Sequence, residues 1–292
     1  MINKFVTYLL LFLGFISSKL SIKKRSELGR LIGNILRVLS TKRKNITYTN
    51  LKNAFPEKSE ELINDILIKS YQNLGIVLIE VLSLKYLDDD DINKYVHYEN
   101  LDLILDVYNR GNGLILLSAH FGNWEFAAYA VGLFTKIPIK IIVKEQQNTI
   151  ADKVLNEYRA KAGNEVVFMN KAARKIINAL FNKECVAILA DQRATKDKDV
   201  YVDFFGMPAS TYEAPASLAL KFKVPVIYGF AVRNKDGTYT VKAKELKTDD
   251  LENNADDIKI LTQRHVNVLE DAIREHPELW TWQHNRWKYK LL

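Results

Sequence analysis

The sequence predicts an α/β protein whose mostly parallel sheet is sandwiched by helices, preceded by N-terminal helices that associate with a membrane. Short apolar runs alternate with amphipathic stretches through most of the chain, which is typical of strands and helices that follow one another. No internal repeat and no Pro/Gly/Ser-rich linker divides it. With 292 residues, 48% of them hydrophobic, the chain can bury a full core in one domain. We therefore expect a single domain over residues 23–292 behind a membrane anchor at residues 1–22.

The predicted anchor depends on residues 5–17, which are almost entirely apolar. They are fewer than the roughly twenty residues that cross a bilayer. The basic stretch that follows lacks the A-x-A pattern of a signal-peptide cleavage site. An inserted or interfacial anchor with a cytoplasmic basic collar fits this pattern better than a signal peptide. The alternative is an ordinary core helix at the start of the domain.

Two amphipathic helices are predicted next, over residues 26–40 and from Ser59 to about residue 81, and they could pack on the core or lie on the bilayer. Strands are expected at 113–119, 137–143, 166–169, 185–190 and 224–232, alternating with helices at 124–134, 148–162, 171–182, 212–222 and 257–275. A turn at 234–237 predicts an antiparallel strand at 239–243. Ligands collect at the carboxyl ends of such strands, where we expect His120, Lys144 and Asp191.

A histidine follows the apolar strand at 113–119, and a carboxylate follows the histidine after five residues. Asn123 is a plausible N-cap for the helix after this turn. His120 would then lie at the strand's end and Glu125 in the first helical turn. The carboxylate could hold one ring nitrogen while the other nitrogen takes a proton from a substrate hydroxyl. The alternative without a catalytic role is a histidine at a strand end beside a solvated glutamate.

Charge and cysteine content restrict the class of protein. The net charge of +7 and a pI near 9.1 indicate an anionic partner. Nucleic acid is not expected, because the basic residues are interleaved with acids and no recognition motif is present. Anionic lipid headgroups or an acidic carrier protein fit the charge at least as well. The one cysteine, Cys185, lies in an apolar run and is expected to be a buried structural thiol. No CxxC or HExxH spacing occurs, so no metal is predicted.

Seven segments, in order along the chain, resemble the lipid A biosynthesis (late) acyltransferase family, within the superfamily of H-x4-D/E membrane (glycerolipid-type) acyltransferases. They are RKN at 43–45 with NLKNAFPE at 50–57, HFGNWE at 120–125, VKEQQN at 143–148, YR at 158–159 with GN at 163–164, ADQR at 190–193, VDFFGMPAST at 202–211 and PELWTWQHNRWK at 277–288. Two departures occur. Lys144 and Glu145 stand where an aromatic and a basic residue are usual, and Asn285 replaces the second arginine of the terminal motif.

The resemblance implies transfer of a fatty acyl group to a hydroxyl of a lipid A precursor, on the cytoplasmic side of an inner membrane. The donor would be an acyl thioester, on acyl carrier protein or on coenzyme A, and no cofactor is implied. A runner-up keeps the chemistry but changes the acceptor to a glycerophospholipid, an aminolipid or a glycolipid. A protein of another class, an inactive membrane-bound scaffold, would lack the intact pair of His120 and Glu125.

Roles for the candidate residues follow from this chemistry. His120 is the expected base and Glu125 its orienting carboxylate. Arg159 is the first choice for stabilising the oxyanion, although it could be a surface ion-pair residue, and backbone amides near Asn123 compete for the role. Asp191 is expected to orient His120 or to bind the acceptor. Lys144 and Arg286 are expected to clamp phosphates. His284 is a weaker catalytic candidate, because packing is the default for a residue in its aromatic surroundings.

Overall fold

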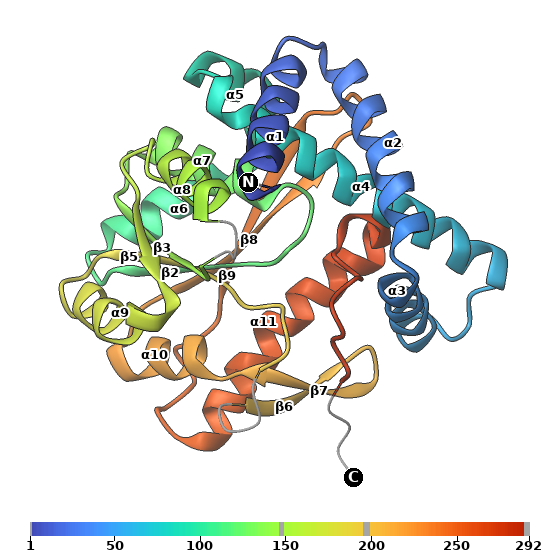
Figure 1. The fold of residues 1–292 in the computed structure, drawn as a ribbon. Helices are drawn as coiled ribbons and strands as arrows, with labels where there is room; N and C mark the ends of the chain where they lie inside the picture. Colours follow the sequence, from blue (N-terminus) through green and yellow to red (C-terminus); the bar gives the residue numbers. More distant parts are fainter. Residues whose placement is uncertain (1, 146–148, 195–198, 289–292) are drawn as a thin grey trace.

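The computed structural model describes residues 2–145, 149–194 and 199–288, and Figure 1 shows its arrangement. In this part of the chain seven strands form one sheet in the order β1-β9-β8-β2-β5-β3-β4, and β6 and β7 form a separate antiparallel hairpin. All pairings in the large sheet are parallel except that of β8 with β9. The predicted α/β class and its mostly parallel sheet are confirmed.

The elements of the described residues follow the predicted alternation of strand and helix. The helices are α1 (Ile2–Ser18), α2 (Ile22–Leu39), α3 (Thr41–Ala54), α4 (Glu60–Ser83), α5 (Asp89–Tyr95), α6 (Leu101–Asn109), α7 (Trp124–Thr135), α8 (Thr149–Arg159), α9 (Ala172–Phe181), α10 (Ala214–Phe222) and α11 (Ala255–Glu275). The strands are β1 (Val96–Tyr98), β2 (Leu114–Ser118), β3 (Ile139–Val143), β4 (Glu165–Phe168), β5 (Cys185–Leu189), β6 (Asp199–Phe204), β7 (Met207–Tyr212), β8 (Val226–Arg233) and β9 (Tyr239–Leu246).

Six of these elements were not predicted, namely α3, α5, α6, β1 and both strands of the hairpin, β6 and β7. The strand β1 is only three residues long, and α5 begins with three aspartates after its Asp88 cap. Neither β1 nor α5 shows the regular spacing of apolar residues by which a strand or a helix can be recognised in the sequence. The helix α3 buries Thr47, Asn50, Leu51 and Ala54, a face that is half polar. Its position is therefore set by tertiary hydrogen bonds rather than by an amphipathic pattern.

The central strand β2 is buried on both faces by two different sets of side chains. Leu114 packs with α6, α7 and the inner face of β3, while Ile115 and Leu117 pack with α9, α10 and α11. Successive strand residues point to opposite faces, so an uninterrupted apolar run is required of a strand covered by helices on both sides. Cys185, the first residue of β5, is fully buried, as predicted for a structural thiol.

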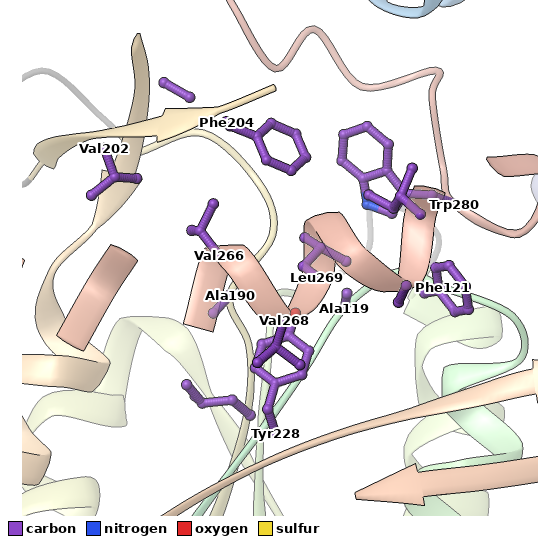
Figure 2. Packing of buried hydrophobic residues seen from close by; sticks show 14 of the residues in the cluster. Ala119, Phe121, Ala190, Val202, Phe204, Tyr228, Val266, Val268, Leu269 and Trp280 are labelled. Atoms are coloured by element: carbon purple, nitrogen blue, oxygen red, sulfur yellow. The ribbon is translucent and has the colours of Figure 1, made fainter. Parts of the chain in front are cut away.

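Side chains of α11 and of the C-terminal segment, residues 277–288, fill the core beneath the carboxyl end of β2. Figure 2 shows Val266 and Leu269 of α11 lying between Phe204 on one side and Ala119 on the other, with Trp280 beside them. The ring of Phe204 meets that of Trp280 edge to face at 5.5 Å. This packing ties the residues just after β2 to a segment about 160 positions later in the chain.

The helix α1 does not stand apart from the remainder of the protein but lies along α4. A Cβ on Gly14 would come within 2.2 Å of the Leu82 carbonyl oxygen, so the two helices approach closely. A similar contact joins α2 to α4, where a Cβ on Gly75 would lie 2.2 Å from the Gly29 carbonyl oxygen. Glycines at these crossings allow α1 and α2 to pack closely against α4.

Of the described helices, one is long and apolar enough to cross a membrane, and it covers residues 60–86. Most of its apolar window, 61%, is buried inside the protein, because it contains the core helix α4. In α1 the apolar stretch Tyr8–Ser18 is shorter than a span. The membrane association predicted for the N-terminal helices remains a prediction.

Candidate active site

His120 lies in a sharp turn between the end of β2 and the start of α7, as the strand, turn and helix pattern predicted. Gly122 has φ +56, and a Cβ there would come within 1.7 Å of the Ala231 carbonyl oxygen, so glycine is required. The side chain of Asn123 accepts from the backbone N–H of Phe126, which confirms the predicted N-cap. The turn thus places the imidazole at the carboxyl edge of the sheet.

The ring of His120 is held by Asp191. The carboxylate Oδ1 lies 2.8 Å from His120 Nδ1, and Oδ2 accepts from the backbone N–H of His120 at 3.1 Å. Asp191 lies two residues after the end of the strand β5, which pairs in parallel with β2 so that Leu189 is opposite Ser118. Parallel neighbours end at the same edge, and this register brings two residues 71 positions apart into contact. Of the two roles expected of Asp191, the geometry supports orientation of His120.

Glu125 does not hold the imidazole, and this corrects the sequence-based expectation. Its carboxylate accepts from Arg159 Nε at 2.8 Å and from Arg159 Nη2 at 2.5 Å, a bidentate ion pair. The indole N–H of Trp124 also reaches Glu125, at 3.2 Å. Asp191, which lies after the neighbouring strand β5, meets Nδ1 instead.

Arg159 is therefore engaged, and its remaining terminal nitrogen, Nη1, donates to Asn156 at 2.9 Å. The side chains of Arg159 and Glu125 are 12% and 7% exposed, so this is no surface ion pair, which was the alternative reading. Their charges act on His120 in opposite senses, since Glu125 raises its pKa and Arg159 lowers it. The pair lies close enough to the imidazole to affect the charge that develops there.

The electrostatics of the site keep the pKa of His120 above its ordinary value. Burial of the ring would lower the pKa, but the charge of Asp191, the hydrogen bond to it and the charge of Glu125 together raise the pKa by more. For Asp191, burial favours the neutral acid. The charge of His120 and the hydrogen bonds from His120 and Trp280 outweigh that effect and lower the carboxyl pKa below its usual range. Asp191 is thus an anion positioned to stabilise an imidazolium.

The segment after α11, residues 277–288, forms one wall of the site, and sequence reasoning did not assign Trp280 or Thr281 there. Trp280 Nε1 donates to Asp191 Oδ2 at 3.0 Å. The backbone N–H and the hydroxyl of Thr281 both donate to the His120 carbonyl oxygen, at 3.1 and 2.9 Å. The signal that could have found them is the richness of the terminal motif in tryptophan, a residue type that often lies in a core. Trp280 and Trp282 are indeed fully buried. This segment fixes both members of the His120 and Asp191 pair.

Residues of the N-terminal motif hold the same segment from the other side. Asn50 Nδ2 donates to the carbonyl oxygens of Trp282 and His284, at 2.8 and 2.7 Å. Arg43 donates to the carbonyl oxygen of Gln283 at 2.9 Å. Residues 282–284 therefore pack on α3, and this explains why a polar helix is needed there.

The remaining candidates are dispersed. Arg286 is 2% exposed and donates to the Ser210 carbonyl oxygen and, at 2.6 Å, to the Thr211 hydroxyl. Burial lowers its pKa to about 10. Such a guanidinium cannot clamp a phosphate that arrives from solvent, which corrects that expectation. Lys144 is exposed directly after β3, at the same edge as His120. Residues 146–148 of its motif lie outside the described residues.

His284 is a packing residue, as the aromatic surroundings suggested. Its Nε2 accepts the backbone N–H of Arg193 at 3.3 Å, and burial lowers its pKa to about 4. The ring is therefore neutral, and it positions the chain just after Asp191.

An imidazole held by a buried aspartate at the carboxyl edge of a parallel sheet defines a general-base site in an α/β enzyme. Comparison with known proteins identifies the kind of enzyme. Residues 1–289 match the model of the bacterial lipid A biosynthesis acyltransferase family, and the chain belongs to this family of acyltransferases. The resemblance inferred from the sequence motifs is confirmed.

Several characterised relatives are similar along most of the chain. A lipid A biosynthesis acyltransferase of Haemophilus influenzae is 26% identical over 83% of this chain and 76% of its own length. The lipid A biosynthesis palmitoleoyltransferase of Escherichia coli is 22% identical over 89% of this chain and 84% of its own. A phosphatidylinositol mannoside acyltransferase of Mycolicibacterium smegmatis is 21% identical over 82% of this chain and 77% of its own.

Proposed function

We propose that the protein transfers a fatty acyl chain from an acyl thioester, carried by acyl carrier protein or coenzyme A, to a hydroxyl of a lipid A precursor. The observation that carries the chemistry is the hydrogen bond between His120 Nδ1 and Asp191. With its proton on Nδ1 and directed at the carboxylate, the ring presents an unprotonated Nε2. That nitrogen is the base that an alcohol nucleophile needs at neutral pH.

In the proposed reaction, the acceptor oxygen attacks the thioester carbonyl carbon while Nε2 takes the hydroxyl proton. A new C–O bond forms and the carbonyl electron pair moves to oxygen. The oxyanion then collapses, the C–S bond breaks, and the departing sulfur receives the proton from Nε2. The products are an ester on the acceptor and a free thiol on the carrier. Asp191 offsets the imidazolium charge between the two steps.

The pair of Glu125 and Arg159 is proposed to set the field around the oxyanion. Arg159 carries a fixed positive charge in a partly buried place, where electrostatic effects are stronger than in water. Its bidentate bond to Glu125 prevents the guanidinium from moving during the reaction. Backbone amides at the start of α7 remain the competing source of oxyanion donors. Lys144, exposed at the same edge, is proposed to contact acceptor phosphate.

We place the protein at the cytoplasmic side of an inner membrane, in contact through α1 and α2. Large apolar side chains are exposed on both helices, namely Tyr8, Leu9, Phe12, Phe15 and Ile16 on α1 and Leu31, Ile35, Val38 and Leu39 on α2. Lys19, Lys23, Lys24 and Arg30 lie exposed among them. An apolar face with a basic border supports binding to anionic lipid. Ile35→Glu with Val38→Glu should shift the protein toward the soluble fraction, and full retention would place the contact elsewhere.

One relative is named for a different lipid acceptor, so a second acceptor is a candidate for this protein. The similarity to a protein named phosphatidylinositol mannoside acyltransferase supports a glycolipid as the alternative acceptor. Lipid mass spectrometry of a strain lacking the protein separates the two. Loss of one fatty acyl mass from lipid A supports the proposal. An unchanged lipid A, with another lipid class altered, assigns the alternative acceptor.

A further inference from the structure

Glu80 is a buried carboxylate, 2% exposed, that the reaction at His120 does not use. It lies on α4, and its Oε2 accepts from Asn123 Nδ2 at 2.9 Å and from the Tyr239 hydroxyl at 2.6 Å. Arg233 Nη2 lies 3.7 Å from the other oxygen. Burial raises the pKa of Glu80, although the charge of Arg233 and the two hydrogen bonds act against that. A carboxylate in this position is costly and stays only where its partners are fixed.

Asn123 is the partner that connects Glu80 to the active site. Its Oδ1 accepts from the backbone N–H of Phe126 at 3.1 Å and caps α7, while its Nδ2 donates to Glu80. Both ends of the amide are therefore bonded, and the side chain cannot turn without losing both bonds. Asn123 ends the turn that begins at His120. Asp191 and Thr281 hold the first end of that turn, and Glu80 holds the second.

We propose that Glu80 is a positioning residue for acyl transfer. It holds Asn123, and Asn123 fixes the turn that carries His120. This rests on the proposed function, because turnover is the quantity that the positioning controls. The imidazole must meet an acceptor hydroxyl within hydrogen-bond reach, and a misplacement of about 1 Å can cost roughly 10²-fold in rate. Without the bond to Glu80, the Asn123 side chain would keep only its cap bond to Phe126, and the second end of the turn would be held less firmly than the first.

The substitution Asn123→Asp tests the bond without removing the helix cap. An aspartate oxygen still accepts from the Phe126 N–H, but the second oxygen faces the carboxylate of Glu80 where no water can separate the two charges. We expect kcat to fall by about 10- to 10²-fold, as for a misplaced catalytic group. KM should change little, since no substrate contact is altered.

The double substitution Glu80→Gln with Asn123→Asp reverses the hydrogen bond and is the decisive variant. The introduced glutamine amide donates to the introduced carboxylate, and its carbonyl oxygen faces Arg233. The Tyr239 hydroxyl, which donates to this position in the unchanged protein, turns to accept from the amide. The number of buried charges is unchanged. We expect this swap to regain most of the turnover lost by Asn123→Asp. Glu80→Gln alone turns its amide nitrogen toward either Arg233 or Asn123, so its turnover should lie below that of the unchanged protein.

Turnover and stability must be measured on the same samples, at a temperature well below every melting point. Val107→Ala, in the fully buried face of α6, is the matched control. It should lower the melting temperature and leave kcat per folded protein unchanged. A normal kcat for Asn123→Asp would overturn the role of Glu80, as would a swap that regains the melting temperature but not turnover. If Asn123→Asp does not fold, an active swap still supports the role and a folded, inactive swap contradicts it. Absence of acyl transfer by the unchanged protein would contradict the proposed function instead.

Discussion

Replacing Asp191 by asparagine should inactivate the enzyme by putting the wrong tautomer on His120. Two N–H groups, from the His120 backbone and from the Trp280 indole, point at Asp191 Oδ2. An asparagine satisfies both only by placing its carbonyl oxygen there. Its NH2 group then occupies the position of Oδ1 and faces His120 Nδ1, which must accept. The ring proton moves to Nε2, and the base that should meet the acceptor hydroxyl is lost.

The magnitude follows from the tautomer and from the lost charge. A histidine held in the wrong tautomer loses about 10⁴-fold in turnover where the same logic operates in a serine protease. In addition, the charge and hydrogen bond of Asp191 are the main causes that raise the His120 pKa, with a smaller contribution from the charge of Glu125. In the unchanged enzyme kcat/KM should rise with pH through an apparent pKa above 6.5, the ordinary value for histidine. Residual activity of Asp191→Asn should rise at a lower pH.

The assay is release of carrier thiol, measured from about pH 5 to 9, a range that spans the ordinary histidine pKa. Trp280→Phe is the matched control, because it removes one donor from the same carboxylate and leaves the bond to Nδ1 in place. It should cost far less turnover than Asp191→Asn. Turnover of Asp191→Asn within a few-fold of normal, or a pH profile that does not move, would refute the tautomer argument.

Three further predictions concern the remaining candidates. Glu125→Ala and Arg159→Ala should each cost roughly 10²-fold in kcat, and the double variant less than the product, since the two act as one unit; steady-state kinetics of the cycle checks this, and fully additive losses would contradict it. Arg286→Ala removes a buried side chain that donates to the Ser210 carbonyl oxygen and to the Thr211 hydroxyl. It should therefore lower the free energy of unfolding, measured by denaturant titration, by about 2–4 kcal/mol, with no salt-dependent change in KM. Lys144→Ala should raise the KM for a phosphorylated acceptor, and the rise should shrink in high salt; an effect on kcat alone would exclude the phosphate contact.

The sequence predicted the sheet because β2 and its neighbours are uninterrupted apolar runs, which strands buried on both faces require. It also predicted the turn after β2, from the end of the apolar run and the Asn123 cap. These features depend on local conformation and on burial, both of which are visible in a single segment. The helix α3 was not predicted, because its buried face carries Asn50, whose side chain donates to a segment more than two hundred residues away.

The choice of partner for His120 shows where sequence reasoning ends. Glu125 is near in the sequence and Asp191 is not, so spacing favoured Glu125. The contact with Asp191 follows from strand order, since β5 lies beside β2. For the same reason the roles of Trp280 and Glu80 could not be assigned, because each acts through a hydrogen bond across distant elements. An arginine such as Arg286 looks the same in a sequence whether it is exposed or buried.

The central claim is that His120 acts as the base in acyl transfer to a lipid A precursor. The most direct test incubates purified enzyme, or its His120→Ala variant, with an acyl thioester and the precursor, and weighs the lipid by mass spectrometry. The unchanged enzyme should add one acyl mass, and His120→Ala should form product about 10²- to 10⁴-fold more slowly while keeping its melting temperature. Product formed by folded His120→Ala at a near-normal rate would contradict the account.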